Sequence, residues 1–127
     1  MRRLAALLFL LSPSVLAGCP TTPATMEAVQ EDVFTLSCAF STCHGDAAEA
    51  ELALTDEATS ASELINVAAF ELAGETRVIP GDPDNSLLYK VLLADVDVVR
   101  QMPVNSSVTD AQADLVRRWI EDGAPTD

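Results

Sequence analysis

Four stretches of this chain carry apolar residues at helical spacing, with turn-forming residues between them. The first covers 24–37, and we expect Thr22 to cap it with Pro23 in its first turn. The second is predicted to begin at the capping box Ser60-x-x-Glu63 and to end near Ala69. Their apolar faces consist of Met26, Val29, Val33 and Leu36 or Phe34 in the first helix, and of Leu64, Ile65 and Val67 in the second.

The third and fourth helices are predicted in the C-terminal third of the chain. One of Asp84, Asn85 and Ser86 is expected to cap a helix from Leu87 to about Leu93. A second capping box, Thr109-x-x-Gln112, starts the last helix, which is predicted to reach about Asp122 and to end at a C-cap glycine, Gly123. The apolar faces consist of Leu87, Leu88, Val91 and Leu92 in the third helix, and of Leu115, Val116, Trp119 and Ile120 in the fourth.

Long connections separate these helices. Residues 45–59 are predicted to form a loop with Leu52-Ala53-Leu54 as its apolar anchor, and 78–83 a rigid turn, because its two prolines fix the backbone. Residues 95–107 are predicted mostly as loop; a short extended piece at Val96, Val98 and Val99 would lack strand partners. The expected fold class is therefore all-α, with about four short helices and long loops.

The first 18 residues have the pattern of a secretion signal. Arg2 and Arg3 precede the apolar run 4–11, which is too short for a confident membrane span. Leu16-Ala17-Gly18-Cys19 resembles the lipobox of bacterial lipoproteins, which implies cleavage before Cys19 and acylation of its thiol. The alternative is a plain signal with a cysteine nearby.

The lipoprotein reading divides the chain into a signal-peptide helix at 1–18, a short tether at 19–25 and a domain at 26–127. The expected location is extracytoplasmic, on the periplasmic side of a double-membraned bacterium. Pro20, rather than an aspartate, follows the lipobox cysteine, which is compatible with anchoring in the outer membrane.

The domain is strongly acidic. The signal holds two of the seven Lys and Arg residues and none of the twenty Asp and Glu residues, so the remainder has a formal charge of 5 − 20 = −15. This charge argues against nucleic-acid binding, which needs a basic face, and against binding anionic lipid by charge. A protein partner would present a basic patch, unless the acidity serves only solubility.

The segment Cys38-Ala39-Phe40-Ser41-Thr42-Cys43-His44 carries the most specific chemistry. His44 is the only histidine of the chain, and Cys38 and Cys43 are the cysteines that remain beside Cys19. Two thiols followed by an imidazole are the groups that attach haem covalently and bind its iron. The usual spacing leaves two residues between the cysteines, and here there are four.

The order of short motifs resembles a small class I cytochrome c, and most closely the cytochrome-c-like domains of planctomycetes and myxobacteria. The resemblance covers nearly all of 26–124. It implies a cytochrome c-like helical bundle around one covalently bound haem c. The matching residues are Cys43-His44-Gly45, Leu52-Ala53-Leu54, the run from Val78 through Pro80-Gly81-Asp82-Pro83 to Tyr89, Met102-Pro103, and Trp119 to Ala124.

The resemblance also assigns the site residues. Cys38 and Cys43 would form the thioether bonds, His44 would be the proximal iron ligand, and Met102 the distal one. The residues agree about Met102, because a chain with one histidine cannot ligate iron with two, and Met26 falls on the apolar face of a helix. The alternative for Met102 is an ordinary core side chain. The resemblance further places Trp119 on the last helix, near the first helix and the haem.

The four-residue insert restricts the local backbone. On a regular helix, two residues five positions apart point about 140° away from each other. Residues 39–42 therefore cannot be regular helix if both thiols reach one edge of a porphyrin, and we expect a bulged or tightened turn there.

Two readings of the cysteines need no haem. A Cys38–Cys43 disulfide beside an ordinary histidine is geometrically possible and suits an oxidising compartment. A zinc site would need a fourth ligand that the sequence does not single out.

The expected function is that of a membrane-anchored monohaem cytochrome that carries single electrons between redox proteins and is not an enzyme. The alternatives are a haem-free, disulfide-containing helical lipoprotein with a binding or structural role, and a small haem peroxidase. The sequence identifies no polar group that would assist peroxide cleavage.

Overall fold

A computed structural model describes residues 21–93 and 100–126. Within these ranges the chain is helical and contains no β-strand, only isolated bridges that join 65 to 78, 68 to 76 and 76 to 86. The predicted all-α class is therefore confirmed for the described part. None of the helices there is both long and apolar enough to span a bilayer.

The first helical run lies where the sequence predicted it, but its cap is different. It consists of α1 (Met26–Val29), a π-helical turn η1 (Gln30–Phe34) and α2 (Thr35–Ser37), which follow each other without a break. Thr25, not Thr22, is the N-cap, and its hydroxyl accepts a hydrogen bond from the Ala28 N–H at 3.1 Å. The buried face uses Phe34, whereas the Leu36 side chain is 62% exposed.

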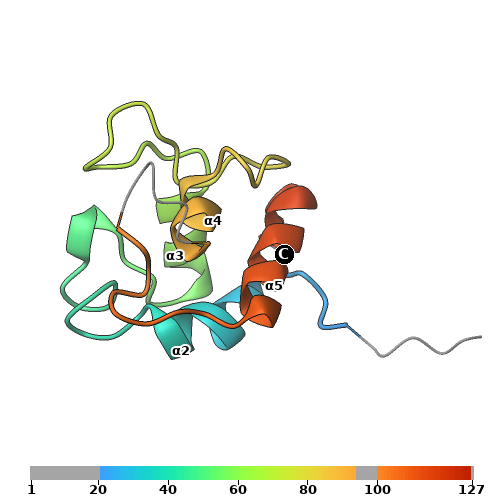
Figure 1. Cartoon of the computed structure of the whole chain (residues 1–127), viewed down its shortest axis with the longest axis horizontal. Helices are drawn as coiled ribbons and strands as arrows, with labels where there is room; N and C mark the ends of the chain where they lie inside the picture. The colour runs from blue at the N-terminus through green and yellow to red at the C-terminus, as the bar shows by residue number, and fades with distance from the viewer. Residues whose placement is uncertain (1–20, 94–99, 127) are drawn as a thin grey trace, which may run out of the picture.

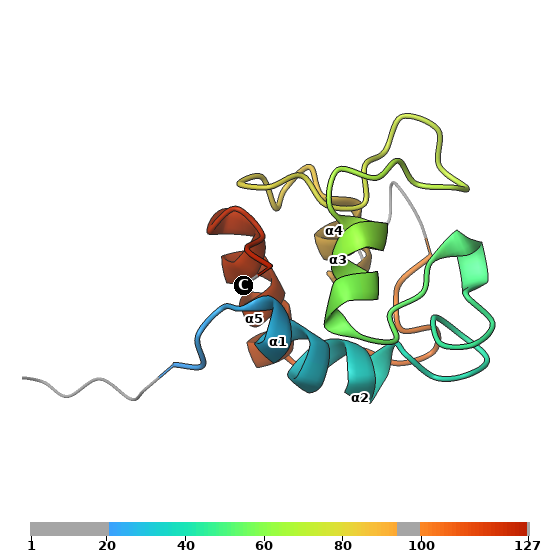
Figure 2. The same ribbon diagram turned by 180° about the vertical axis from the view of Figure 1, so that it is seen from behind.

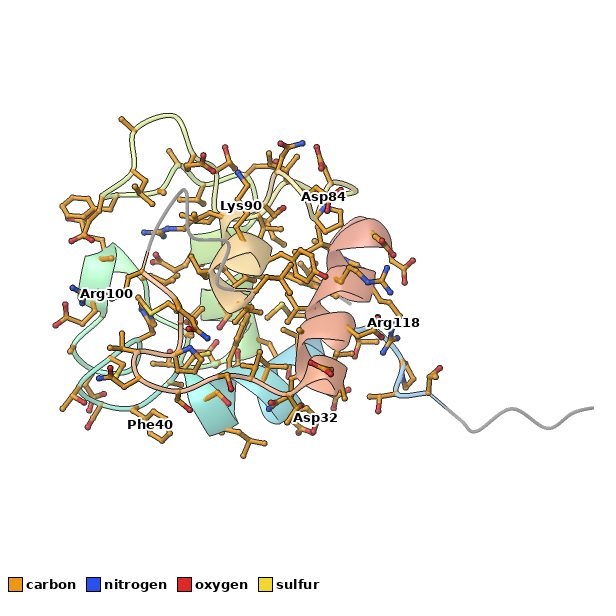
Figure 3. The ribbon with its side chains drawn as sticks, viewed as in Figure 1. Asp32, Phe40, Asp84, Lys90, Arg100 and Arg118 are labelled. Carbon is orange, nitrogen blue, oxygen red and sulfur yellow. The ribbon has the colours of Figure 1, made fainter. Side chains whose placement is uncertain are left out.

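Thr22 instead belongs to a tether held against the last helix. The Arg118 guanidinium donates to the Thr22 carbonyl at 3.0 Å. Figure 3 shows the Arg118 side chain where the N-terminal tether meets that helix, α5 (Asp110–Glu121). The helix begins only after Thr25, because Thr25 is extended (φ −107°, ψ 162°) and its side chain caps the first turn.

The prediction for the second helix is wrong at both ends. Helix α3 spans Glu57–Leu64, and its cap is Asp56, whose carboxylate accepts from the Thr59 N–H at 3.0 Å. This bond lowers the pKa of the Asp56 carboxyl below its ordinary value. Ser60 is buried inside the helix and makes no cap. The helix ends at Leu64 because Ile65 is extended and Asn66 has a φ of 58°.

The predicted loop 45–59 therefore ends in helix. It also contains the single 3₁₀ turn η2 (Glu49–Glu51). The expected extended piece at Val96, Val98 and Val99 lies outside the described residues.

The two C-terminal helices agree with the prediction. Helix α4 spans Leu87–Leu92, with Ser86 at the cap position. The Ser86 hydroxyl accepts from the Ile79 N–H and donates to the Asp82 carbonyl, both at 2.8 Å, so it braces the turn 78–83. Helix α5 begins with the predicted capping box: the Thr109 hydroxyl accepts from Gln112 N–H at 3.2 Å, and the Gln112 amide oxygen from Thr109 N–H at 2.9 Å.

The helices pack so that one end of the molecule is closed and the other is formed by loops. Helix α1 contacts α5 and α3, and α4 also contacts α5. Figures 1 and 2 show the tether leaving beside α5, while η2 and the chain that leads into α5 lie at the opposite end. The core is built from Met26, Val29, Val33, Phe34, Leu54, Leu64, Val78, Leu88, Leu92, Leu115, Val116, Trp119 and Ile120.

Candidate functional site

The first helical run delivers the chain to Cys38 and ends there. Ser37 is the last helical residue, and 39–42 leave the helix, as was expected on the hypothesis that both thiols reach one porphyrin edge. Hydrogen bonds from Cys43 N–H to the Phe40 carbonyl (2.9 Å) and from His44 N–H to the Cys38 carbonyl (3.2 Å) close the insert into a compact turn. The expectation of a tightened turn is thus confirmed.

Gly45 packs against this turn at very short range. A Cβ atom at position 45 would lie 2.7 Å from the Ala39 carbonyl oxygen and 2.8 Å from the Phe40 carbonyl oxygen. Both neighbours are backbone atoms, so a side chain could be accommodated only by moving the turn. Glycine is therefore required here by close approach, and the backbone fixed in this way carries His44.

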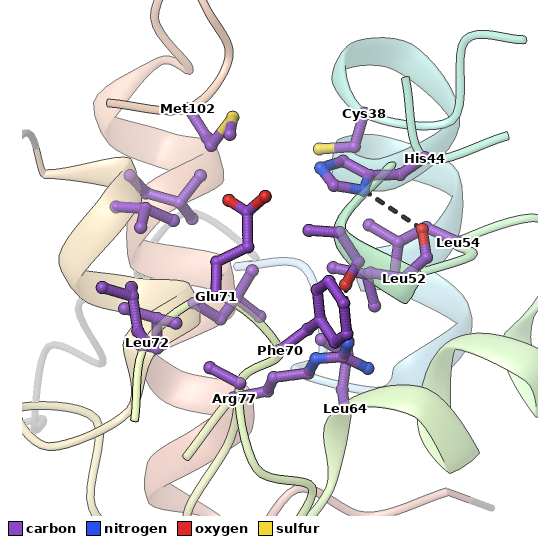
Figure 4. A pocket seen from close by; sticks show the side chains of 16 residues that line it. Cys38, His44, Leu52, Leu54, Leu64, Phe70, Glu71, Leu72, Arg77 and Met102 are labelled. Atoms are coloured by element: carbon purple, nitrogen blue, oxygen red, sulfur yellow. Dashed lines mark hydrogen bonds between the residues drawn. The ribbon is translucent and has the colours of Figure 1, made fainter. Parts of the chain in front are cut away.

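The His44 ring is oriented by a backbone carbonyl. Its Nδ1 lies 3.1 Å from the Leu52 carbonyl oxygen, and the Leu54 N–H donates to the His44 carbonyl at 2.7 Å. Because a carbonyl only accepts, Nδ1 carries the proton and Nε2 of the neutral ring has a lone pair for a metal. Figure 4 shows the ring projecting into a cavity.

Met102 lies on the opposite wall of that cavity. Figure 4 shows its thioether facing His44 and Cys38 across the space. Met102 belongs to the segment that leads into α5, and its N–H donates to the Val91 carbonyl at 3.0 Å, which fixes this segment against α4. An imidazole and a thioether from distant parts of the chain thus approach one space from two sides.

The space has an apolar inner part of about 120 Å³ and a more polar outer part of about 330 Å³. Cys38, His44, Ala50, Glu71 and Met102 line both parts. The inner wall is made largely of aliphatic side chains from the segment 52–54, the end of α3 and helix α4, among them Leu52, Leu54, Leu64, Leu88, Val91 and Leu92.

The two cysteines differ in their surroundings. Cys38 is half-buried and lines both parts of the cavity, whereas Cys43 is exposed and lines only the outer part. Burial, with a smaller contribution from Cys43, raises the pKa of the Cys38 thiol to about 12. Both are free thiols, so the disulfide considered from the sequence is absent from this structure.

Glu71 is a residue that sequence reasoning missed. Its carboxylate lies between Met102 on one wall and His44 with Cys38 on the other (Figure 4). The side chain is exposed, so it is able to turn toward solvent when a larger group enters. The sequence identified no polar group that would assist peroxide cleavage, whereas the structure places a carboxylate in the cavity that Met102 lines. A single glutamate in a loop belongs to no motif, so the sequence does not predict that Glu71 lies in the cavity.

Buried Arg77 and Gln30 were also missed. Arg77 lines the inner cavity and is only 7% exposed. Gln30 donates to the Leu54 carbonyl at 3.0 Å, and its amide oxygen accepts from the Ser60 hydroxyl at 2.7 Å. The sequence offered one signal for Gln30, because this polar residue stands among the apolar-face positions of the first helix, where a buried polar contact is expected.

Other predicted features lie apart from the cavity. Trp119 is fully buried on α5, where its indole N–H donates to the Pro125 carbonyl at 2.9 Å, and it does not line the cavity. Cys19 lies outside the described residues. Among the described residues, no group of three or more His, Cys, Asp or Glu side chains is placed to hold a metal ion. The hypothesis of a zinc site therefore finds no ligand set in that part of the chain.

Comparison with protein-family models, with curated proteins and with solved structures finds no match to this chain.

Proposed function

We propose that this chain is a membrane-anchored monohaem c-type cytochrome that carries single electrons between extracytoplasmic redox partners. The observation that carries the proposal is the pair of His44 and Met102 on opposite walls of one apolar cavity. An imidazole opposite a thioether is a ligand set of electron-carrying haem iron. The cytochrome c-like order of the sequence motifs supports the same fold and function.

The residues present fit a haem. His44 would bind through Nε2, because Nδ1 is already engaged by the Leu52 carbonyl. Met102 would bind from the other side, and Cys38 and Cys43 are free thiols that would form the thioether bonds. Haem supplies the one-electron chemistry, and a methionine ligand raises its reduction potential. The aliphatic wall of the cavity keeps water from the bound group.

The remaining parts of the proposal follow from this ligation and from the sequence. If His44 and Met102 both bind the iron, no ligand position would be left for a substrate, so the protein would not itself be an enzyme. A lipid on Cys19 would hold it on the periplasmic side of the outer membrane. The acidic surface favours redox partners that dock through a basic patch, and disfavours nucleic acid.

The test is to purify the processed protein from a host with cytochrome c maturation, using a tag without histidine. We expect a Soret band and haem that stays attached after denaturation. Met102→Leu should abolish the Met–iron charge-transfer band and lower the reduction potential, because the thioether ligand that raises this potential is lost. Met26→Leu is the matched control, since Met26 is a fully buried core methionine, and it should change neither. A colourless product with a Cys38–Cys43 disulfide would overturn the proposal.

A small haem peroxidase is the second candidate, because the Glu71 carboxylate lies in the cavity between the two walls. A carboxylate near the distal side is a group that is able to move a proton. This candidate requires an open distal position. Rapid cyanide binding by the ferric wild type, and loss of peroxide turnover in Glu71→Gln, would favour it over electron transfer alone.

A further inference from the structure

Arg77 connects three segments around the cavity through its guanidinium group. One terminal nitrogen donates to the Glu63 carbonyl at 2.7 Å and to the Glu63 carboxylate at 3.2 Å, at the end of α3. The other donates to the carbonyls of Ala50 at 3.0 Å and Glu51 at 2.8 Å, in η2. Since Arg77 is only 7% exposed, these bonds replace water that the guanidinium has lost.

The two carbonyls in η2 belong to strained residues. Ala50 has a φ of 57° and Glu51 a φ of 53°, in the left-handed region that disfavours residues with a Cβ atom. Such conformations persist where surrounding contacts hold them. The bonds from Arg77 end on the carbonyls of both residues. Backbone bonds from Glu49 N–H to the Cys43 carbonyl (3.0 Å) and from Leu52 N–H to the Glu49 carbonyl (3.3 Å) hold the two ends of the same turn.

The strained residues lead directly to the carbonyl that orients His44. Leu52 follows Glu51 in an extended conformation, and its carbonyl accepts the His44 Nδ1–H. Two residues farther on, the Leu54 carbonyl is fixed independently by buried Gln30. The segment 50–54 is thus held at one end by Arg77 and at the other by Gln30, and the contact with His44 lies between.

We propose that Arg77 is a positioning residue for the proximal ligand. By holding Ala50 and Glu51 in left-handed conformations, it places the Leu52 carbonyl where it accepts the Nδ1–H of His44. The description of His44 as a proximal ligand rests on the proposed function. The hydrogen bond between His44 Nδ1 and the Leu52 carbonyl does not depend on haem. Arg77 therefore acts on His44 through the backbone and not through its charge.

The single histidine makes this proposal directly measurable. Protein labelled with [¹⁵N]histidine and purified on a tag without histidine gives ring signals from His44 alone. The quantity to measure is the solvent-exchange rate of the Nδ1 proton in the protein as purified. In Arg77→Met, which keeps an unbranched apolar stem but removes the donors, we expect exchange to be about tenfold faster, as for the loss of one hydrogen bond. If haem is bound, the reduction potential should also rise, because the carbonyl no longer increases the basicity of the ring.

Two further variants separate positioning from general destabilisation. Glu63→Gln leaves the bonds from Arg77 to η2 intact, so exchange should stay as in the wild type. Lys90→Met removes a half-buried ion pair with Glu75 (2.8 Å) that does not contact η2, and it too should leave the ring unchanged. If Arg77→Met does not fold, Arg77→Lys decides: it retains the charge but not the forked donors, and faster exchange is still expected.

Wild-type exchange in a folded Arg77 variant, or an equal effect of Lys90→Met, would overturn the inference. A wild type without haem would instead overturn the proposed function, and the same exchange measurement on the haem-free protein would still decide the role of Arg77.

Discussion

Cys38 and Cys43 flank one short turn, yet they are chemically different residues. Cys43 is exposed, whereas Cys38 faces the cavity, and its burial raises the pKa of the thiol to about 12 from an ordinary value of 9.0. A neutral, half-buried thiol is a weak nucleophile. The high pKa of the Cys38 thiol therefore results from its position beside the cavity and not from the residues next to it in the sequence.

This difference predicts a pH dependence in protein prepared without haem. Above pH 9 the unfolded chain loses the Cys38 proton while the folded chain keeps it until about pH 12, so the folded state binds more protons. The free energy of unfolding should therefore fall as the pH rises from 9 toward 12. Urea titrations at pH 8 and pH 10 should show a smaller decline in Cys38→Ala than in the wild type or Cys43→Ala. Equal declines in all three proteins would contradict the prediction.

At the scale of elements, two similar sequence signals have different outcomes. Thr109-x-x-Gln112 forms a capping box, whereas Ser60-x-x-Glu63 does not, because Asp56 already caps α3 one turn earlier. The Ser60 hydroxyl instead donates to Gln30 in η1 at 2.7 Å, away from solvent. The capping-box pattern at Ser60 therefore does not form, and the Ser60 hydroxyl instead bonds to Gln30, thirty positions away.

Ser60→Ala should destabilise the fold by about 1–3 kcal/mol, because the Gln30 amide oxygen is left buried without its donor. Ser62→Ala is the matched control on the same helix. The Ser62 hydroxyl is exposed and donates to the Thr59 carbonyl at 2.9 Å, so its loss should stay within about 0.5 kcal/mol of the wild type. Thermal or urea unfolding measures both, and equal effects would rule out the buried role of Ser60.

At the scale of the whole molecule, the two ends of the fold differ in how they are stabilised. Helix α1 contacts α5, and Val29 of α1, Val33 of η1, and Val116 and Trp119 of α5 are completely buried although none of them lines the cavity. The other end consists of loops around an open space. A bound apolar plate would supply the packing that these loops lack among themselves.

If the proposed haem is bound, its removal should affect the two ends of the fold unevenly. In hydrogen exchange followed by mass spectrometry, protein made without haem should keep slow amides in α1 and α5. Residues 46–54 and 66–76 should exchange much faster than in the haem-loaded protein, because binding stabilises only the state with the closed cavity. The same protection pattern in both forms would show that these loops order themselves without a ligand.

The sequence by itself determined the helical class and the positions of the first, third and last helices. These features depend on local spacing, on caps and on the angle between neighbouring helical positions, which a short window of residues contains. It also gave Cys38, Cys43, His44 and Met102 as candidate site residues, since their side chains are rare in this chain and have specific chemistry, and all four line the cavity.

Only the tertiary structure decided that His44 and Met102 face each other, that Glu71 lies between them, and that Arg77 and Gln30 hold the segment beside His44. These relations join residues far apart in the chain through burial and hydrogen bonds to backbone carbonyls. A carbonyl is present at every position, so the sequence does not mark the one at Leu52 that the His44 ring uses. Its selection depends on how the packed helices and loops bring that atom to the ring.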